Sequence, residues 1–232
     1  MKLQTGERLD DLQLQNLHII QHPDRFCFGV DAVFLSDFVR VKNKERVLDL
    51  GTGTGILPIL LSAKTKGQQF FGLEIQEECA DMARRSVLHN HLEDKISIVQ
   101  GDIKEAYSLF KHERIDVITC NPPYMIAEHG YQSIGDSIAI ARHEILVSLE
   151  DIIRESSRLL LENKGRFYMI HKPFRLIEIV SLMSKYRIEP KRIQFIHPYI
   201  DKEPTMVMIE GIRGGKSRVT IEPPIVHYTR RL

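Results

Sequence analysis

Short apolar runs alternate with amphipathic stretches between residues 45 and 170. The apolar runs have the length of buried strands, and the amphipathic stretches have the spacing of helices that cover a sheet. This alternation is typical of βαβ units, so we predict an α/β fold with a mostly parallel sheet and helices on both faces. The predicted strands are 46–50, 69–75, 95–100, 115–120 and 165–171, and the predicted helices are 56–64, 77–90 and 146–161.

Further elements are expected on both sides of this region. A helix is predicted at 173–185, followed by strands near 192–197 and 205–210. These two strands are close in sequence, with proline in the loop between them, so we expect an antiparallel pair at the sheet edge and about seven strands in all. Upstream, the pattern predicts a short hairpin formed by residues 17–21 and 25–28, and then a helix at 31–39.

Charge is unevenly distributed along a chain whose formal net charge is only +1. Residues 164–232 carry 14 Lys and Arg against 6 Asp and Glu, so the remaining residues have a negative balance. Such asymmetry indicates a polyanionic partner or, as the plainer alternative, a solvated basic face.

Cysteine, histidine and hydropathy patterns narrow the class of protein. The 3 cysteines form no CxxC pair, and the 10 histidines include no HExxH, so we expect reduced thiols and no metal site. No apolar run is long enough to span a membrane, and the N-terminus lacks the basic-then-apolar order of a secretory signal. We therefore expect a cytoplasmic protein without a membrane partner.

A glycine-rich turn follows the first predicted strand of the βαβ region and opens the next helix. It has the sequence Asp49-Leu50-Gly51-Thr52-Gly53-Thr54-Gly55. Glycines let the backbone turn sharply and approach a ligand, and the amides at the start of a helix then face that ligand. A GxGxG turn alone is a weak signal, because other turns use it too.

Acidic residues at the ends of the next two strands strengthen this signal. Glu74, followed by Ile75, closes the second strand, where a carboxylate can accept hydrogen bonds from both hydroxyls of a ribose. Asp102, followed by Ile103, closes the third strand, where it can bind an adenine amino group or cap a helix. NAD binding is matched less well, because its fingerprint is GxGxxG.

The motif Asn121-Pro122-Pro123-Tyr124 directly follows the fourth strand. Ligands bind at the carboxyl ends of strands in open parallel sheets, so the motif is expected beside the glycine turn. The side-chain oxygen of Asn121 and the carbonyl of Pro122 can each accept one hydrogen of an NH₂ group, and Tyr124 offers a flat face for stacking. These residues, Asn121, Pro122 and Tyr124, are the predicted catalytic residues.

The glycine turn with Asp49, Glu74 and Asp102 resembles the first three cofactor motifs of class I methyltransferases. The resemblance implies a Rossmann-like fold and S-adenosylmethionine as cofactor. It assigns the methionine part to Asp49 and the glycine turn, the ribose to Glu74, and the adenine to Asp102 with Ile103. The Asn-Pro-Pro-Tyr motif resembles that of amino methyltransferases, which act either on adenine N6 (or cytosine N4) or on the glutamine N5 of release factors.

Two further segments resemble bacterial tRNA adenine-N6 methyltransferases that act on valine tRNA. They are Phe28-Gly29-Val30-Asp31-Ala32-Val33-Phe34-Leu35 and Ala141-Arg142-His143-Glu144. The glutamine enzymes typically carry a helical domain ahead of the fold, and only 44 residues precede the first strand here. By this resemblance Gly29 and Asp31 close over the cofactor, whereas Arg142, His143 and Glu144 line the substrate entrance or form an ion-paired helix start.

The resemblance implies one function, N6-methylation of an adenine in tRNA, namely position 37 in the anticodon loop of valine tRNA. Glutamine N5-methylation of a protein and adenine methylation in another RNA remain alternatives. We expect a monomer with three parts: 1–44 covering the cofactor site, a methyltransferase domain at 45–212 and a basic C-terminal segment at 213–232. The predicted cofactor-binding residues are Gly29, Asp31, Asp49, Gly51, Gly53, Thr54, Gly55, Glu74, Ile75, Asp102, Ile103 and Asn121.

Overall fold

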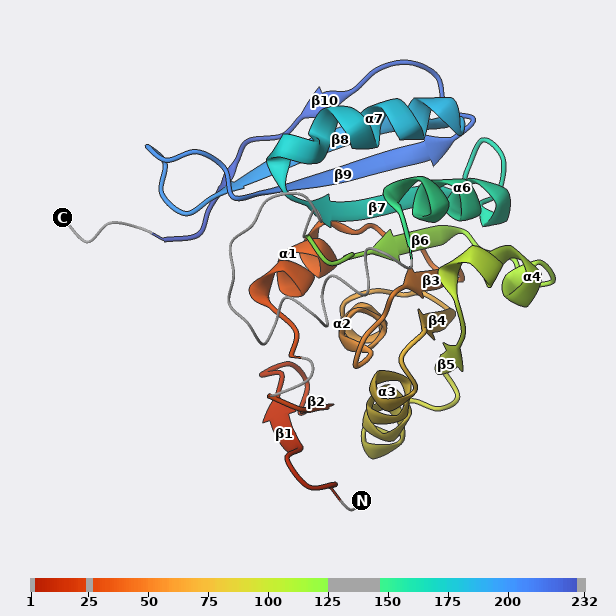
Figure 1. The fold of residues 1–232 in the computed structure, drawn as a ribbon, viewed down its shortest axis with the longest axis vertical. Coiled ribbons are helices and arrows are strands. Elements are labelled where there is room, and N and C mark those ends of the chain that lie inside the picture. The colour runs from red at the N-terminus through yellow and green to blue at the C-terminus, as the bar shows by residue number, and fades with distance from the viewer. Residues whose placement is uncertain (1–2, 24–26, 125–146, 229–232) are drawn as a thin grey trace.

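The computed structural model describes residues 3–23, 27–124 and 147–228. One sheet of nine strands forms its centre, with helices on both faces, and a two-stranded hairpin lies near the N-terminus (Figure 1). The strand order is β10-β8-β9-β7-β6-β3-β4-β5, and β11 also pairs with β8. The α/β fold with a mostly parallel sheet, predicted from the sequence, is confirmed.

Five neighbouring strands form the parallel part of the sheet, joined by helical crossovers. The strands are β3 (Arg46–Leu50), β4 (Gln69–Glu74), β5 (Ile96–Gln100), β6 (Val117–Cys120) and β7 (Arg166–His171). The described helices are α1 (Val30–Phe38), α2 (Ile56–Lys64), α3 (Glu77–His89), η1 (Ile103–Glu105), α4 (Ala106–Phe110), α6 (Leu149–Leu159), η2 (Pro173–Arg175) and α7 (Leu176–Lys185).

Alternating side chains of the central strands feed two hydrophobic cores. In β7, Phe167 and Met169 pack into the core that contains α4, α6 and α7, whereas Tyr168 and Ile170 pack into the core that contains α1 and α2. Because both faces are covered, every residue of β7 is buried. This explains why the strand has a nearly continuous apolar sequence.

The antiparallel edge is larger than expected. β8 (Ile188–His197) pairs antiparallel with β9 (Met206–Arg213), which also pairs antiparallel with β7. β8 is not the last strand, because β10 (Thr220–Ile221) and β11 (Ile225–Val226) pair with it in parallel. The C-terminal segment predicted from residue 213 is therefore attached to the sheet as far as its described residues extend.

The N-terminal hairpin has a different strand partner from the predicted one. β2 (His18–Gln21) pairs with β1 (Arg8–Asp11), an earlier segment. Of the predicted partner 25–28, residues 27 and 28 belong to no strand and the rest lies outside the described residues. The hairpin is anchored on α3, where the Ile20 amide donates to Ser86 Oγ at 2.9 Å and Ile20 packs with Met82. This tertiary contact selects the pairing, because β1 itself is polar and has little strand signal.

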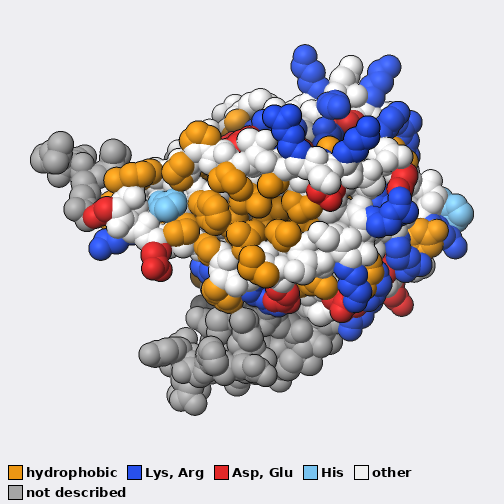
Figure 2. Space-filling view, turned by 90° about the horizontal axis from the view of Figure 1, so that it is seen from above, with side chains coloured by type: hydrophobic (Ala, Val, Ile, Leu, Met, Phe, Trp, Pro, Cys, Tyr) orange, Lys and Arg blue, Asp and Glu red, His pale blue; other side chains and the backbone are white. Residues whose placement is uncertain are grey.

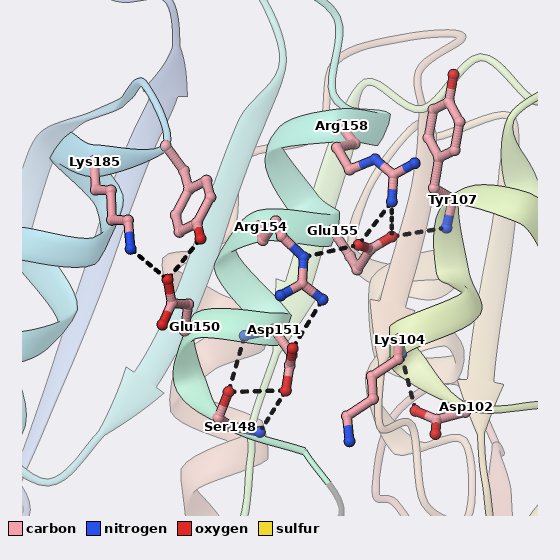
Figure 3. Close-up of polar contacts among 11 residues, drawn as sticks. Asp102, Lys104, Tyr107, Ser148, Glu150, Asp151, Arg154, Glu155, Arg158 and Lys185 are labelled. Carbon is pink, nitrogen blue, oxygen red and sulfur yellow. Dashed lines mark hydrogen bonds and ion pairs between the residues drawn. The ribbon is translucent and has the colours of Figure 1, made fainter.

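Helices α4, α6 and α7 are joined by a polar network that the sequence pattern did not reveal (Figure 3). The buried carboxylate of Glu155 accepts hydrogen bonds from the Tyr107 amide at 3.3 Å and from Arg158 at 2.9 Å. On the other side of α6, Lys185 lies 2.6 Å from Glu150. Helix α4, which the sequence pattern did not predict because it has only five residues, is held against α6 by the bond from Tyr107 to Glu155.

Figure 2 shows a hydrophobic area flanked by Lys and Arg on the face of the molecule seen from above. The exposed large hydrophobic side chains in and next to η2, α7 and β10 are Phe174, Ile177, Val219 and Ile221. Among the described helices, none is both long and apolar enough to cross a membrane. Within the same residues, no cluster of three or more His, Cys, Asp or Glu side chains is arranged to hold a metal ion.

Candidate active site

A cavity of about 280 Å³ lies at the carboxyl ends of β3, β4, β6 and β7. The glycine turn after β3, the acidic end of β4 and the Asn-Pro-Pro-Tyr motif after β6 all contribute to its wall, and residues just before and within α1 complete one side. The predicted site residues that line it are Gly29, Asp31, Asp49, Gly51, Gly53, Glu74, Ile75, Ile103, Asn121, Pro122 and Tyr124.

Three predicted cofactor residues do not line this cavity. Thr54 is fully buried beneath the glycine turn. Gly55 begins α2 with φ of +86°, and a β-carbon there would lie 3.2 Å from that of Ala83. The Asp102 carboxylate accepts a hydrogen bond from the Lys104 amide at 2.9 Å, so it caps η1 (Figure 3). The structure therefore shows for Asp102 the helix-capping role that the sequence left open.

Glu74 is fixed in place by backbone amides. Its two carboxylate oxygens accept hydrogen bonds from Gly53 at 2.8 Å and from Gln76 at 2.9 Å. The amide of Gly51, whose φ is +72°, donates to the Leu73 carbonyl at 2.9 Å, which holds the turn against β4. The carboxylate keeps lone pairs for a ligand, because each oxygen has accepted only one of these hydrogens.

Asp49 is the most perturbed acid in the cavity. Its side chain is buried at the end of β3 and accepts a hydrogen bond from Thr119 Oγ at 2.6 Å. Burial raises the pKa of Asp49 to about 7, because few groups compensate the lost hydration of its charge. The hydroxyl of the neighbouring Thr52 is also buried, and its interaction with the carboxyl group of Asp49 partly opposes the rise of that pKa. This part of the wall is therefore polar.

Tyr124 connects the Asn-Pro-Pro-Tyr motif to helix α1. Its hydroxyl lies within hydrogen-bonding distance of both Asp31 Oδ2 and Asn121 Oδ1. A phenol has one hydrogen, so it donates to one of these oxygens at a time. Burial, followed by the charge of Asp31, raises the pKa of Tyr124, which keeps the hydroxyl protonated. Lys172 Nζ lies 5.1 Å from the centre of the Tyr124 ring.

His171 also lines the cavity and was not predicted from the sequence. It is the last residue of β7, the strand next to β6, and it is fully buried. Its ring contacts that of Tyr124 edge to face, with centroids 5.4 Å apart. The signal that could have revealed it is positional, because a polar residue ended an otherwise apolar strand at the ligand-binding edge.

The remaining sequence predictions concern Arg142 to Glu144 and the basic C-terminal third of the chain. Arg142, His143 and Glu144 lie outside the described residues. Arg192 belongs to the basic C-terminal third, for which a polyanionic partner was one interpretation, but it is buried, pairs with Glu210 and donates to the Phe38 carbonyl at 2.7 Å. Arg192 is therefore not part of a surface for a polyanion, because a side chain committed to internal acceptors cannot reach a phosphate.

Comparisons with known proteins agree with this geometry. The family model described as "Methyltransferase small domain" matches residues 16–187. The tRNA1(Val) (adenine(37)-N6)-methyltransferase of Porphyromonas gingivalis is 30% identical over 72% of this chain and 65% of its own length. The matched part thus spans just under two thirds of that relative.

Solved structures show the same fold. A predicted O-methyltransferase from Agrobacterium tumefaciens superposes with a TM-score of 0.68 and 22% identity, over 87% of this chain and 89% of that one. Geranyl diphosphate C-methyltransferase from Streptomyces coelicolor, solved with S-adenosyl-L-homocysteine, has a TM-score of 0.58 and 15% identity, over 79% and 77%. Fold and family model agree: this chain belongs to the methyltransferase small domain family.

Proposed function

We propose that this protein transfers a methyl group from S-adenosylmethionine to N6 of an adenine in tRNA, at position 37 of valine tRNA. The observation that carries the proposal is the meeting of the glycine turn, Glu74 and the Asn-Pro-Pro-Tyr motif in one cavity. The name of the Porphyromonas gingivalis relative supports the choice of substrate.

The residues present fit the proposed cofactor. Glu74 offers fixed carboxylate oxygens to the ribose hydroxyls, and Ile75 with Ile103 provides apolar contact for the adenosine. The turn from Gly51 and the hydroxyl of Thr52 would hold the methionine part, beside Asp49. When bound, the cofactor supplies an electrophilic methyl group on a sulfonium.

The N-terminal part of the chain serves as a cover in this proposal. Phe28, Gly29 and Asp31 line the cavity although they precede the first strand of the central sheet. The hydrogen-bonding contact between Asp31 and Tyr124 joins this cover to the acceptor motif. We therefore assign residues 1–44 to closing the site and residues 45–212 to the methyltransferase domain.

The acceptor amino group is held by oxygens of the motif. Asn121 Oδ1 and the Pro122 carbonyl each accept one hydrogen of the NH₂ group, which directs the nitrogen lone pair toward the methyl group. Tyr124 stacks on the base, which must leave its loop stack to enter the cavity. Orientation and electrostatics carry such a displacement, because the leaving group is already activated.

We assign tRNA binding to the exposed basic residues of the C-terminal third, which excludes the buried Arg192. Lys216 and Arg218 are exposed in the segment that leads into β10, next to the exposed Val219. Lys191 donates to the carbonyl of Lys216, so the two lysines lie together. Neutralising Lys216 or Arg218 should each reduce the slope of the logarithm of the tRNA binding constant against the logarithm of salt concentration by about one, as expected for phosphate contacts.

Incubation with radiolabelled S-adenosylmethionine tests the proposed activity. The wild-type protein should label a valine tRNA transcript, and digestion should place the label in N6-methyladenosine. Asn121→Ala should lower the rate by about 10²–10³-fold, because it removes one oriented acceptor, while cofactor binding is retained.

Asn43→Ala, an exposed asparagine away from the cavity, is the matched control and should keep full activity. Label that appears in a release factor and not in tRNA would contradict the proposed substrate. Full activity of Asn121→Ala would contradict the role given to that side chain.

A further inference from the structure

His171 provides a hydrogen-bond donor that the proposed chemistry has not used. Its side chain is fully buried, it lines the cavity, and its Nε2 atom has no protein partner within the described residues. A buried donor without an acceptor costs about 1–3 kcal/mol. An unpaired donor in the wall of a ligand cavity therefore indicates an acceptor on the ligand.

The backbone fixes which nitrogen carries the hydrogen. The Lys172 amide donates to His171 Nδ1 at 2.8 Å, so Nδ1 uses its lone pair as an acceptor. Burial lowers the pKa of His171 to about 4, and the ring is therefore neutral near pH 7. The single hydrogen of the neutral ring is then on Nε2. With both nitrogens committed in this way, His171 cannot take a proton from the substrate.

The location of His171 places this donor beside the acceptor motif. Cys120 of β6 is in register with Met169 of β7. The two strands are parallel, so Pro122 and His171, each two residues further along, lie at the same level of the sheet edge. The His171 ring also contacts the Tyr124 ring. The donor thus lies next to the groups that hold an amino nitrogen and stack on its ring.

We propose that His171 Nε2–H donates a hydrogen bond to a ring nitrogen adjacent to the amino group of the substrate adenine. This inference rests on the proposed function. The oxygens of Asn121 and Pro122 recognise only NH₂ hydrogens, which many compounds carry. A donor at the neighbouring position recognises the acceptor nitrogen N1 or N7, and so fixes which edge of the base enters the cavity.

The experiment uses valine tRNA transcripts that carry adenosine, 1-deazaadenosine or 7-deazaadenosine at position 37. Each is methylated by the wild-type protein, by His171→Phe, which keeps a planar ring without the donor, and by His171→Gln, whose amide can donate from a similar position. Cofactor affinity and thermal unfolding of each variant are measured in parallel, so that a folding defect is separated from a loss of recognition.

One deaza analogue should lower kcat/KM of the wild-type protein by about tenfold to a hundredfold, the range expected for one lost hydrogen bond. On the adenosine transcript, His171→Phe should have a kcat/KM that is lower than that of the wild type by a similar factor. On the sensitive analogue, His171→Phe and the wild type should have the same kcat/KM, because the hydrogen bond is already absent. His171→Gln should recover part of the lost kcat/KM on adenosine. The proposal would be overturned if His171→Phe lowered kcat/KM on both analogues by the same factor as on adenosine. It would also be overturned if neither analogue lowered kcat/KM of the wild-type protein. Methylation of the unmodified transcript tests the proposed function separately, because the comparison among transcripts concerns only His171.

Discussion

Replacing Asp49 with asparagine should make the stability of the protein less sensitive to pH. In the folded protein burial raises the pKa of this carboxyl group to about 7 from its ordinary value of 3.8. Between these two values the folded protein holds one proton that the unfolded chain has released. Stability from this group is therefore present at low pH and is lost as the pH rises through 7.

The magnitude follows from the two pKa values. Each unit of difference is worth about 1.4 kcal/mol, so the full effect is about 4 kcal/mol, and about 3 kcal/mol of it falls between pH 5 and pH 8. Asp49 is only 2% exposed, so solvent screening does not reduce this value much. Asparagine does not titrate, and any cost of burying its amide is the same at every pH.

Urea unfolding of the wild-type protein and of Asp49→Asn at pH 5, 6, 7 and 8 measures the effect. The free energy of unfolding of the variant minus that of the wild type should increase by about 3 kcal/mol from pH 5 to pH 8. Asp94→Asn, at an exposed position, controls for the loss of one negative charge. A difference between wild type and Asp49→Asn that stays constant with pH would refute the buried, protonated carboxyl group.

Three other predictions follow from named contacts. Calorimetry in buffers of different ionisation enthalpy should show that cofactor binding at pH 6 releases about one proton. The reason is that the positive ammonium group of the cofactor favours the ionised form of Asp49. Cofactor binding to Asp49→Asn should release no proton. Gly55→Ala should destabilise the protein by more than Gly51→Ala in urea unfolding, by about 1–3 kcal/mol, because both have positive φ but only Gly55 meets a close neighbour; equal losses would contradict this. Arg192→Ala should cost about 3–5 kcal/mol by leaving a buried carboxylate unpaired, whereas Arg187→Ala, at an exposed pair, should cost under about 1 kcal/mol in thermal unfolding.

The central fold was predictable because each element carries its own signal. Helix α2 lies at Ile56–Lys64, as the pattern predicted, and its Pro58 is tolerated in the first turn. The five parallel strands were expected within about two residues of their observed ends. Elements with short or polar sequences were missed: α4, β1, β10 and β11 gain most of their stability from neighbours.

The site was predictable only where chemistry requires a particular residue at a particular place. The glycine turn, Glu74 and the Asn-Pro-Pro-Tyr motif follow successive strand ends, and parallel strands bring those ends to one edge. Asp102 fits both a cofactor contact and a helix cap by sequence, and the structure shows the cap. Arg192 adds to the basic balance of the C-terminal third although it is buried, because charge counts do not record burial.

The sequence by itself determined the order of the central strands and the main helices, the glycine turn and the residues that follow each strand, because these depend on local periodicity and backbone freedom. The tertiary structure alone decided which polar groups are buried and which remain without partners. The pKa of Asp49, the link from Tyr124 to Asp31 and the free donor of His171 all depend on the surroundings of each group. Their chemistry was decided by contacts between residues far apart in the chain, because hydration and hydrogen-bond partners are set only when the chain packs.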